Sequence, residues 1–246
     1  LPAVSPDGKK IAFTSRRNGP DHIFVMDADG ASPTLLTSGS SGGSHPTWSP
    51  DGTRIAFTSS EKIYVMDADG GNQKALTNSF YHFDQDPSWS PDGKKIAFCA
   101  WYALSGKWAI HVINADGSDR TVLSEKDDFF PGWSPDSSKL VFISIRDGNL
   151  GLYEMNADGS GRQKRLMSDK SDKFMPSYSP DGKKIAFAKN IGDWFASGGG
   201  NFDIHTINTD GTGLTRVTDN SIQNGYVTFA TYKEGHFNVD RLGIFK

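Results

Sequence analysis

The chain has 246 residues, with 26 lysines and arginines against 29 aspartates and glutamates and a net charge of -3. This balance lacks the basic character of nucleic-acid-binding domains, so we expect no nucleic-acid partner. No apolar run approaches the roughly 20 residues of a membrane-spanning helix, so we also expect no membrane span.

A repeated pattern sets the order of the predicted elements. Its clearest copy, residues 48–57, reads Trp-Ser-Pro-Asp-Gly-Thr-Arg-Ile-Ala-Phe. Ser-Pro-Asp steps begin at Ser5, Ser49, Ser90, Ser134 and Ser179. Successive steps lie about 41 to 45 residues apart, which is the period of a propeller blade.

Each repeat predicts a four-stranded antiparallel blade. In the second repeat the strands are expected at 46–48, 54–58, 62–66 and 74–77, where polar and apolar residues alternate or form short apolar runs. The turn after the first strand contains Pro50, Asp51 and Gly52, which favour a fixed φ, a side-chain bond to the backbone and a positive φ respectively. A second turn, Asp-Ala-Asp-Gly at 67–70, follows the third strand.

The other repeats vary around this plan. The third, about 86–123, carries an aromatic insertion at 101–108, and the fifth, from Pro176, carries a long insertion at 190–201. After Thr218 the pattern weakens, although 227–231 and 237–242 align with the second and third strands of a repeat. We therefore predict a single all-β propeller domain, residues 1–246, with six blades and an incomplete last blade closed by the chain termini. The alternative is five blades followed by a C-terminal hairpin.

The repeat resembles the WD-like repeat of the TolB-type β-propeller family over nearly the whole chain. The features that carry the resemblance are Trp-Ser-Pro-Asp-Gly-Lys-Lys-Ile-Ala-Phe, Ile-Tyr-Val-Met-Asp-Ala-Asp-Gly and a closing Leu-Thr. The resemblance implies a bacterial protein of the periplasm or cell surface. The family member that gives the family its name binds a peptidoglycan-associated lipoprotein at the mouth of the channel. The resemblance therefore implies a protein partner at the channel mouth of this chain.

The repeats also indicate where a binding site is expected. The two turn types are nearly identical in every repeat, whereas the connections between strands two and three, and between blades, differ in length and chemistry. We call the surface formed by these variable connections the varied face, and variable loops are where function usually lies. Aromatic residues with nearby charged or polar groups are typical of interaction hot spots. The candidate binding residues are Trp101, Tyr102, Trp108, Trp194, Phe195, Tyr81, His82, Phe83, Asp84, Asp86, His45, Asp128, Phe129 and Lys173.

Some aromatic residues have a second interpretation. Phe130 and Phe174 precede a predicted innermost strand and could pack between blades rather than contact a ligand. We expect Cys99, the single cysteine, to fill the interior of a strand; one cysteine cannot form a disulfide within the chain.

No motif predicts catalysis. The chain contains no His-Glu-x-x-His or Walker sequence and no Gly-x-Ser-x-Gly nucleophile elbow joining a strand to a helix, so no catalytic residue is assigned and we expect a protein that is not an enzyme. Six histidines leave open a metal-dependent polysaccharide lyase, a role that related propellers have. We expect no cofactor, with a structural cation in the central channel, near Asp86, as an open alternative.

The sequence thus predicts a non-enzymatic, monomeric platform that recognises a protein or peptide over the channel mouth through its aromatic connections. A carbohydrate ligand is the first alternative. The second is the substrate-gating propeller of a larger peptidase.

Overall fold

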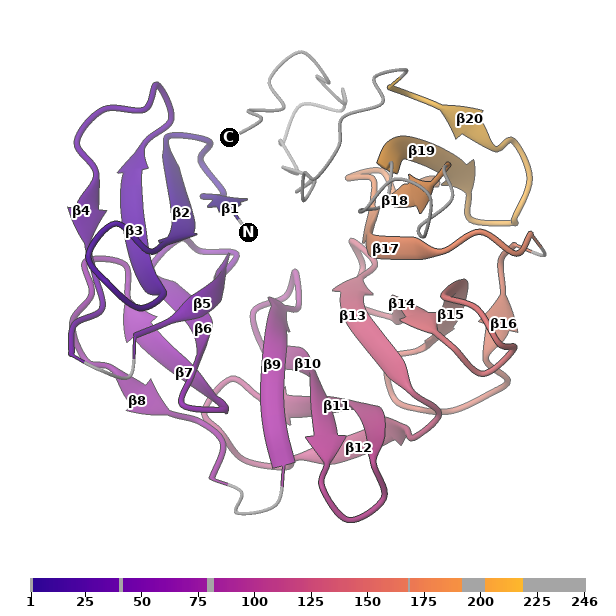
Figure 1. The fold of residues 1–246 in the computed structure, drawn as a ribbon, viewed down its shortest axis with the longest axis horizontal. Helices are drawn as coiled ribbons and strands as arrows, with labels where there is room; N and C mark the ends of the chain where they lie inside the picture. The colour runs from indigo at the N-terminus through magenta and orange to yellow at the C-terminus, as the bar shows by residue number, and fades with distance from the viewer. Residues whose placement is uncertain (1, 40–41, 79–81, 168, 192–201, 219–246) are drawn as a thin grey trace.

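The computed structural model describes residues 2–39, 42–78, 82–167, 169–191 and 202–218. Within these ranges the chain forms five antiparallel sheets of four strands each, arranged in an arc around a common centre (Figure 1). The first strand of each sheet lies nearest the centre and the fourth strand lies at the outer edge. The predicted all-β propeller of four-stranded blades is confirmed.

The blades follow one another in chain order, each with the same strand order. Blade 1 comprises β1 (Pro2–Val4), β2 (Lys10–Ser15), β3 (His22–Asp27) and β4 (Thr34–Leu35). Blade 2 comprises β5 (Ser44–Trp48), β6 (Arg54–Ser59), β7 (Lys62–Asp67) and β8 (Lys74–Ala75). Blade 3 comprises β9 (His82–Trp89), β10 (Lys95–Tyr102), β11 (Lys107–Asn114) and β12 (Thr121–Ser124). Blade 4 comprises β13 (Asp128–Trp133), β14 (Lys139–Ser144), β15 (Gly151–Asn156) and β16 (Lys164–Arg165). Blade 5 comprises β17 (Lys173–Tyr178), β18 (Lys184–Asn190), β19 (Phe202–Asn208) and β20 (Thr215–Arg216).

The prediction of six blades is wrong, because the described residues form five sheets. The N-terminal strand β1 pairs with β2, with Ala3 opposite Ala12, so blade 1 takes all four strands from residues 2–35. The chain after Thr218 lacks the Ser-Pro-Asp-Gly turn or its Ser-Pro-Asp-Ser variant, one of which joins strands one and two in every blade described. The segments 227–231 and 237–242, including the hairpin of the five-blade alternative, lie outside the described residues.

The Ser-Pro-Asp-Gly turns have the geometry that their residues predict. In blade 2 the Ser49 hydroxyl donates to Asp51 Oδ1 at 2.6 Å and accepts from the Arg54 amide at 2.9 Å. Gly52 adopts a φ of 71°, the left-handed conformation that glycine accepts without steric cost. Blade 4 has Ser137 at this position, and it adopts a φ of 61°.

The hydrophobic core lies between the blades. Four clusters of buried apolar residues fill the junctions of successive blades. In blades 2 and 4 the tryptophan that ends the innermost strand also bonds to the preceding blade: Trp48 Nε1 donates to the Ala3 carbonyl at 3.0 Å, and Trp133 Nε1 donates to the Ser88 carbonyl at 2.9 Å. Cys99 is fully buried, as predicted.

A backbone hydrogen bond joins successive blades on the varied face, and we call it the inter-blade latch. In each case an amide near the start of the innermost strand of one blade donates to a carbonyl within one residue of the start of strand three of the preceding blade. The latches run from Gly43 to Asp21 (2.6 Å), Asp84 to Glu61 (2.9 Å), Asp127 to Trp108 (3.0 Å) and Lys173 to Leu150 (3.0 Å). The variable connections are therefore fixed to their neighbours at every junction of the described blades.

Candidate functional site

Blade 3 projects beyond its neighbour on the varied face. Its strands β9, β10 and β11 have eight residues each, whereas β6 and β7 of blade 2 have six. The sequence-based placement of Trp101 and Trp108 in a long loop is wrong, because both lie in strands and pair directly across β10 and β11. Aromatic residues favour such cross-strand pairs, which extends the hairpin and leaves only four residues at its tip. Leu104 at this tip is 90% exposed.

Four aromatic side chains form a continuous row along this extension. Phe83 on β9 stacks on Trp101 with ring centroids 5.0 Å apart and planes within 6°. Trp101 is paired with Trp108 on β11, and Trp108 contacts Phe129 of blade 4 at 5.6 Å. Phe83 is 37% exposed. We call Phe83, Trp101, Trp108 and Phe129 the aromatic row.

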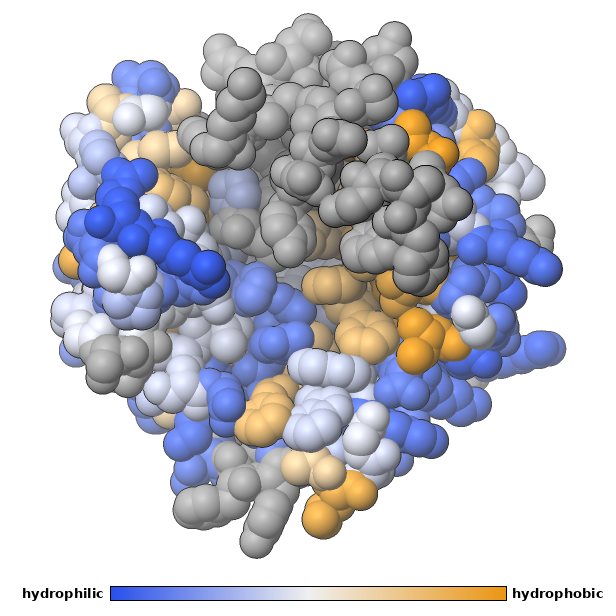
Figure 2. Space-filling view, viewed as in Figure 1, coloured by the Kyte–Doolittle hydropathy of each residue, from blue (hydrophilic) through white to orange (hydrophobic). Residues whose placement is uncertain are grey.

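The row continues towards blade 5. Phe129 contacts Phe130 at 6.3 Å, Phe130 contacts Phe174 at 6.5 Å, and Phe174 meets Phe202 edge-on at 5.2 Å. Phe129 and Phe130 also pack against the buried cluster between blades 4 and 5, as the second interpretation of Phe130 predicts. Figure 2 shows hydrophobic side chains gathered near the centre of the arc, on the side of blades 3 to 5. An apolar band thus runs across three blades.

Three of the charged candidate residues lie in the interior. Asp84, Asp128 and Lys173 are fully buried. Asp84 accepts two hydrogen bonds from the Arg120 guanidinium, at 2.8 and 2.9 Å. Asp128 pairs with Arg146 at 2.8 Å, and Lys173 pairs with Asp169. A buried charge needs such a partner, so these residues form ion pairs in the interior and do not present free charges at the surface.

The innermost strands share a feature that the sequence analysis missed. In blades 2 to 5 the residue before the proline of the innermost strand adopts a left-handed conformation, and the strand pairing shifts there as in a β-bulge. The residues are His45 (φ 54°), Asp86 (φ 55°), Phe130 (φ 54°) and Met175 (φ 51°). A residue before proline ordinarily prefers extended backbone, and bulges re-aim side chains next to functional sites. The repeated x-Pro step was the signal that could have revealed this ring of equivalent positions.

Two of these positions form a polar contact. His45 Nε2 lies 3.4 Å from Asp86 Oδ1, and the Cys99 thiol donates to Asp86 Oδ2 at 3.4 Å. The Asp86 side chain is only 9% exposed, and burial raises the pKa of its carboxyl group. Burial also raises the pKa of the Cys99 thiol, so this cysteine is a poor nucleophile.

The remaining candidates are divided between described and undescribed regions. His82 and Tyr102 lie on the side of blade 3 opposite the aromatic row, with ring centroids 4.1 Å apart in an edge-on contact. Tyr81, Trp194 and Phe195 lie outside the described residues. The structure therefore brings together the aromatic candidates of blades 3 and 4, with His82 and Tyr102 behind them.

Sequence comparison places these features in a known family. The family described as the TolB beta propeller domain matches residues 1–62 and 60–237. The chain belongs to this family. The match confirms the resemblance seen in the repeats and covers all five blades.

Curated relatives match this TolB propeller over shorter segments. The Tol-Pal system protein TolB of Methylobacillus flagellatus is 37% identical over 73 residues, which is 28% of this chain and 17% of that protein. The protein of the same name from Anaeromyxobacter dehalogenans is 39% identical over 82 residues, or 31% of this chain and 18% of that protein. The aligned segments thus span less than a fifth of the length of either relative.

Solved structures support the fold over a longer range. A putative TolB from Agrobacterium tumefaciens superposes with a TM-score of 0.76 and 24% identity, covering 88% of this chain and 79% of that one. TolB from Acinetobacter baumannii gives 0.74 and 24%, covering 92% and 56%. An oligogalacturonate lyase in complex with manganese gives 0.68 and 14%, covering 88% and 64%. At these identities the likeness shows a shared fold and nothing of activity.

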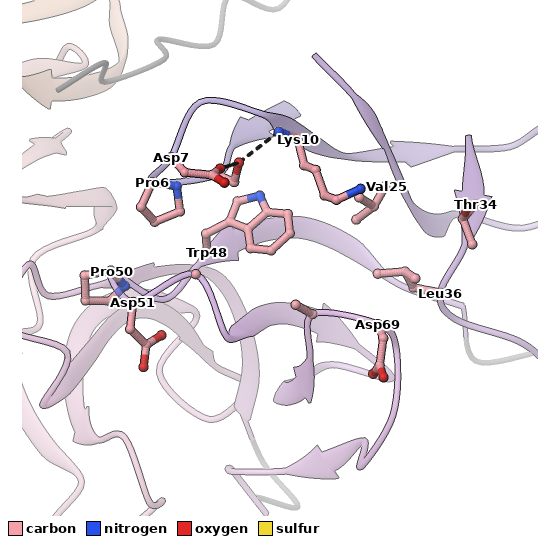
Figure 3. Close-up of a pocket in the computed structure, with 13 residues that line it drawn as sticks. Pro6, Asp7, Lys10, Val25, Thr34, Leu36, Trp48, Pro50, Asp51 and Asp69 are labelled. Carbon is pink, nitrogen blue, oxygen red and sulfur yellow. Dashed lines mark hydrogen bonds between the residues drawn. The ribbon is translucent and has the colours of Figure 1, made fainter. Parts of the chain in front are cut away.

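This TolB propeller also has a groove on the opposite face, between blades 1 and 2. Its volume is about 730 Å³, and Figure 3 shows Trp48 between the turn that holds Pro6 and Asp7 and the turn that holds Pro50 and Asp51. Asp7 already accepts a hydrogen bond from the Ser5 hydroxyl at 2.6 Å. The groove is lined by residues of the repeated turns, and none of the candidate binding residues lines it.

Two features of the described ranges bear on the alternative of a metal site and on the prediction of no membrane span. Within those ranges no three His, Cys, Asp or Glu side chains come together in a way that could hold a metal ion. The channel cation therefore stays a prediction. No helix in the same ranges is long and apolar enough to cross a membrane.

Proposed function

We propose that this TolB propeller is a non-enzymatic platform that binds a protein through the aromatic row. The observation that supports the proposal most directly is the arrangement of the aromatic row on the varied face. Phe83 stacks on Trp101, Trp101 lies opposite Trp108 in the paired strands, and Trp108 contacts Phe129 of blade 4. Tryptophan and other aromatic residues dominate the binding energy of protein interfaces.

The platform is rigid before it binds. Trp101 and Trp108 lie in paired strands rather than in a loop, and the latch from Asp127 to the Trp108 carbonyl, at 3.0 Å, fixes the base of the row. The Trp108 amide also donates to the Asp127 carboxylate at 3.0 Å. Little conformational entropy is lost when a partner docks on side chains that are already ordered, so such a surface can bind tightly with few contacts.

The proposed partner is a protein of the bacterial cell envelope. The curated relatives are named as proteins of the Tol-Pal system. The family resemblance supports the peptidoglycan-associated lipoprotein as the first candidate, and it favours an interaction in the periplasm. We take the lipid-free domain of that lipoprotein from the same organism as the probe.

The test measures binding of this probe by isothermal titration calorimetry. Trp101→Ala and Trp108→Ala are each expected to weaken binding about 30-fold or more, since a hot-spot aromatic contributes about 2 kcal/mol or more. Leu214→Ala is the matched control, because Leu214 is a 45% exposed hydrophobic residue that follows the turn ending at Gly211, away from the row.

Equal affinity in both tryptophan variants and the control would refute the proposal. Binding of a soluble peptidoglycan glycan, with no binding of the protein probe, would support the carbohydrate alternative instead. Circular dichroism of each variant confirms that a loss of binding is not a loss of fold.

A further inference from the structure

A polar network supports the projecting hairpin of blade 3 from the side opposite the aromatic row. The Tyr102 hydroxyl lies 3.0 Å from His111 Nε2, and Arg120 Nε donates to His111 Nδ1 at 3.0 Å. Arg120 also donates two hydrogen bonds to Asp84. His111 is 1% exposed and Asp84 is fully buried, so the network is sealed on its inner side.

These contacts fix where the protons lie. A guanidinium group is always protonated and can only donate, so His111 Nδ1 must accept from Arg120 and carries no hydrogen. A neutral imidazole then has its hydrogen on Nε2, which donates to the Tyr102 oxygen. The hydroxyl hydrogen of Tyr102 therefore points away from the network.

Burial and a neighbouring positive charge keep the His111 ring neutral. Burial and the adjacent Arg120 charge hold the pKa of His111 at about 3. The hydrogen bonds of the described residues include no acceptor for the Tyr102 hydroxyl proton.

Tyr102 lies at the raised end of blade 3, where its side chain is half-buried. Tyr102 is the last residue of β10 and pairs with Lys107 across the hairpin. The neighbouring blade 2 ends lower, because β6 and β7 are joined by a tight turn at Ser60 and Glu61, which have φ values of 47° and 61°. Two extra residues per strand raise the end of blade 3 by about 7 Å, at about 3.3 Å per residue.

We infer that Tyr102 determines specificity at the proposed binding surface by donating its hydroxyl proton to a carbonyl or carboxylate oxygen of the bound protein. The inference rests on the proposed function, since it adds a directed polar contact on the other side of the hairpin that carries Trp101 and Trp108. A donor group of the partner is disfavoured at this point, because one lone pair of the Tyr102 oxygen is already used by His111 and the Arg120 charge lies behind it.

The first measurement is the tautomer of His111, read from the 15N chemical shifts of its ring. The network requires hydrogen on Nε2 and none on Nδ1. Observation of the Nδ1-protonated form would overturn the inference, because Tyr102 would then donate to His111 and would have no proton to offer.

The second measurement is binding of the lipid-free lipoprotein domain to Tyr102→Phe. This change keeps the ring against His82 and removes only the hydroxyl, and it is expected to weaken binding about 5- to 10-fold, the effect of one hydrogen bond. Tyr64→Phe on β7 is the matched control and should bind like the unmodified chain.

The outcomes separate the two proposals. If Trp101→Ala weakens binding and Tyr102→Phe does not, the inference fails while the proposed function stands. If neither change alters affinity, or if the unmodified chain does not bind the probe, both are overturned.

Discussion

The buried imidazole of His111 should make the propeller sensitive to acid, and His111→Gln should remove that part of the sensitivity. A glutamine side chain can still accept from Arg120 through its oxygen and donate to Tyr102 through its amide, but it does not titrate. The comparison therefore isolates the proton that His111 takes up on unfolding.

The sign and size follow from the two pKa values. In the unfolded chain the histidine titrates near 6.5, whereas burial and Arg120 lower its folded pKa to about 3. Between these values the unfolded state binds a proton that the folded state does not, so stability falls as the pH falls below 6.5. At pH 5 the gap of about 1.5 pH units corresponds to a loss of about 2 kcal/mol relative to pH 8.

The assay is urea unfolding at pH 8 and at pH 5 for both proteins, followed by tryptophan fluorescence. The unmodified chain should lose about 2 kcal/mol more than His111→Gln on acidification. Other histidines with lowered pKa values, His82 and His205, contribute equally to both proteins and cancel in the difference. An identical pH dependence in the two proteins would show that His111 is accessible to protons in the folded state and would refute the reasoning.

Two further predictions concern the buried ion pair within blade 3 and a close contact between blades 4 and 5, and urea unfolding measures both. Arg120→Ala should lower the free energy of unfolding by about 3 to 5 kcal/mol, because it leaves the buried Asp84 carboxylate unpaired, whereas Arg16→Ala breaks an exposed pair and should leave the free energy of unfolding nearly unchanged; similar losses would contradict this. Gly211→Ala should destabilise more than Gly30→Ala, because the two glycines have φ values of 94° and 92° but only the first would place a Cβ 2.7 Å from a carbonyl oxygen of the neighbouring blade. Equal losses would show that the neighbouring blade moves away from the added Cβ with no loss of free energy of unfolding.

The repeat itself was predictable because its chemistry is local. Ser49, Asp51 and Gly52 lie within four residues of one another, and their hydrogen bonds and positive φ follow from residue type alone. The same is true of the four-stranded blades, whose strands follow each other in the sequence. The number of blades was not predictable in this way, since closure of a ring depends on how the two ends of the chain meet.

The candidate site was predicted only in part, because contacts between residues far apart in the sequence cannot be read from a local pattern. The aromatic residues of blade 3 were identified from their position in a variable connection, but their pairing in extended strands depends on facing partners such as Trp101 and Trp108. The burial of Asp84 was hidden because its partner, Arg120, lies 36 residues further along the chain. Charged residues in a connection are exposed by default, and only a distant counter-charge reverses that expectation.

The inter-blade latches have a consequence for how such a surface can change. Each acceptor carbonyl lies where the variable connection meets strand three, within one residue of the start of that strand, so residues can be added to or removed from the preceding part of the connection without moving the bond. In blade 3 the hairpin is longer than in blade 2, yet the carbonyls of Trp108 and Glu61 accept equivalent bonds from the next blade. In a propeller built this way, one recognition hairpin can change in length or sequence while the spacing of the blades and the other hairpins stay the same.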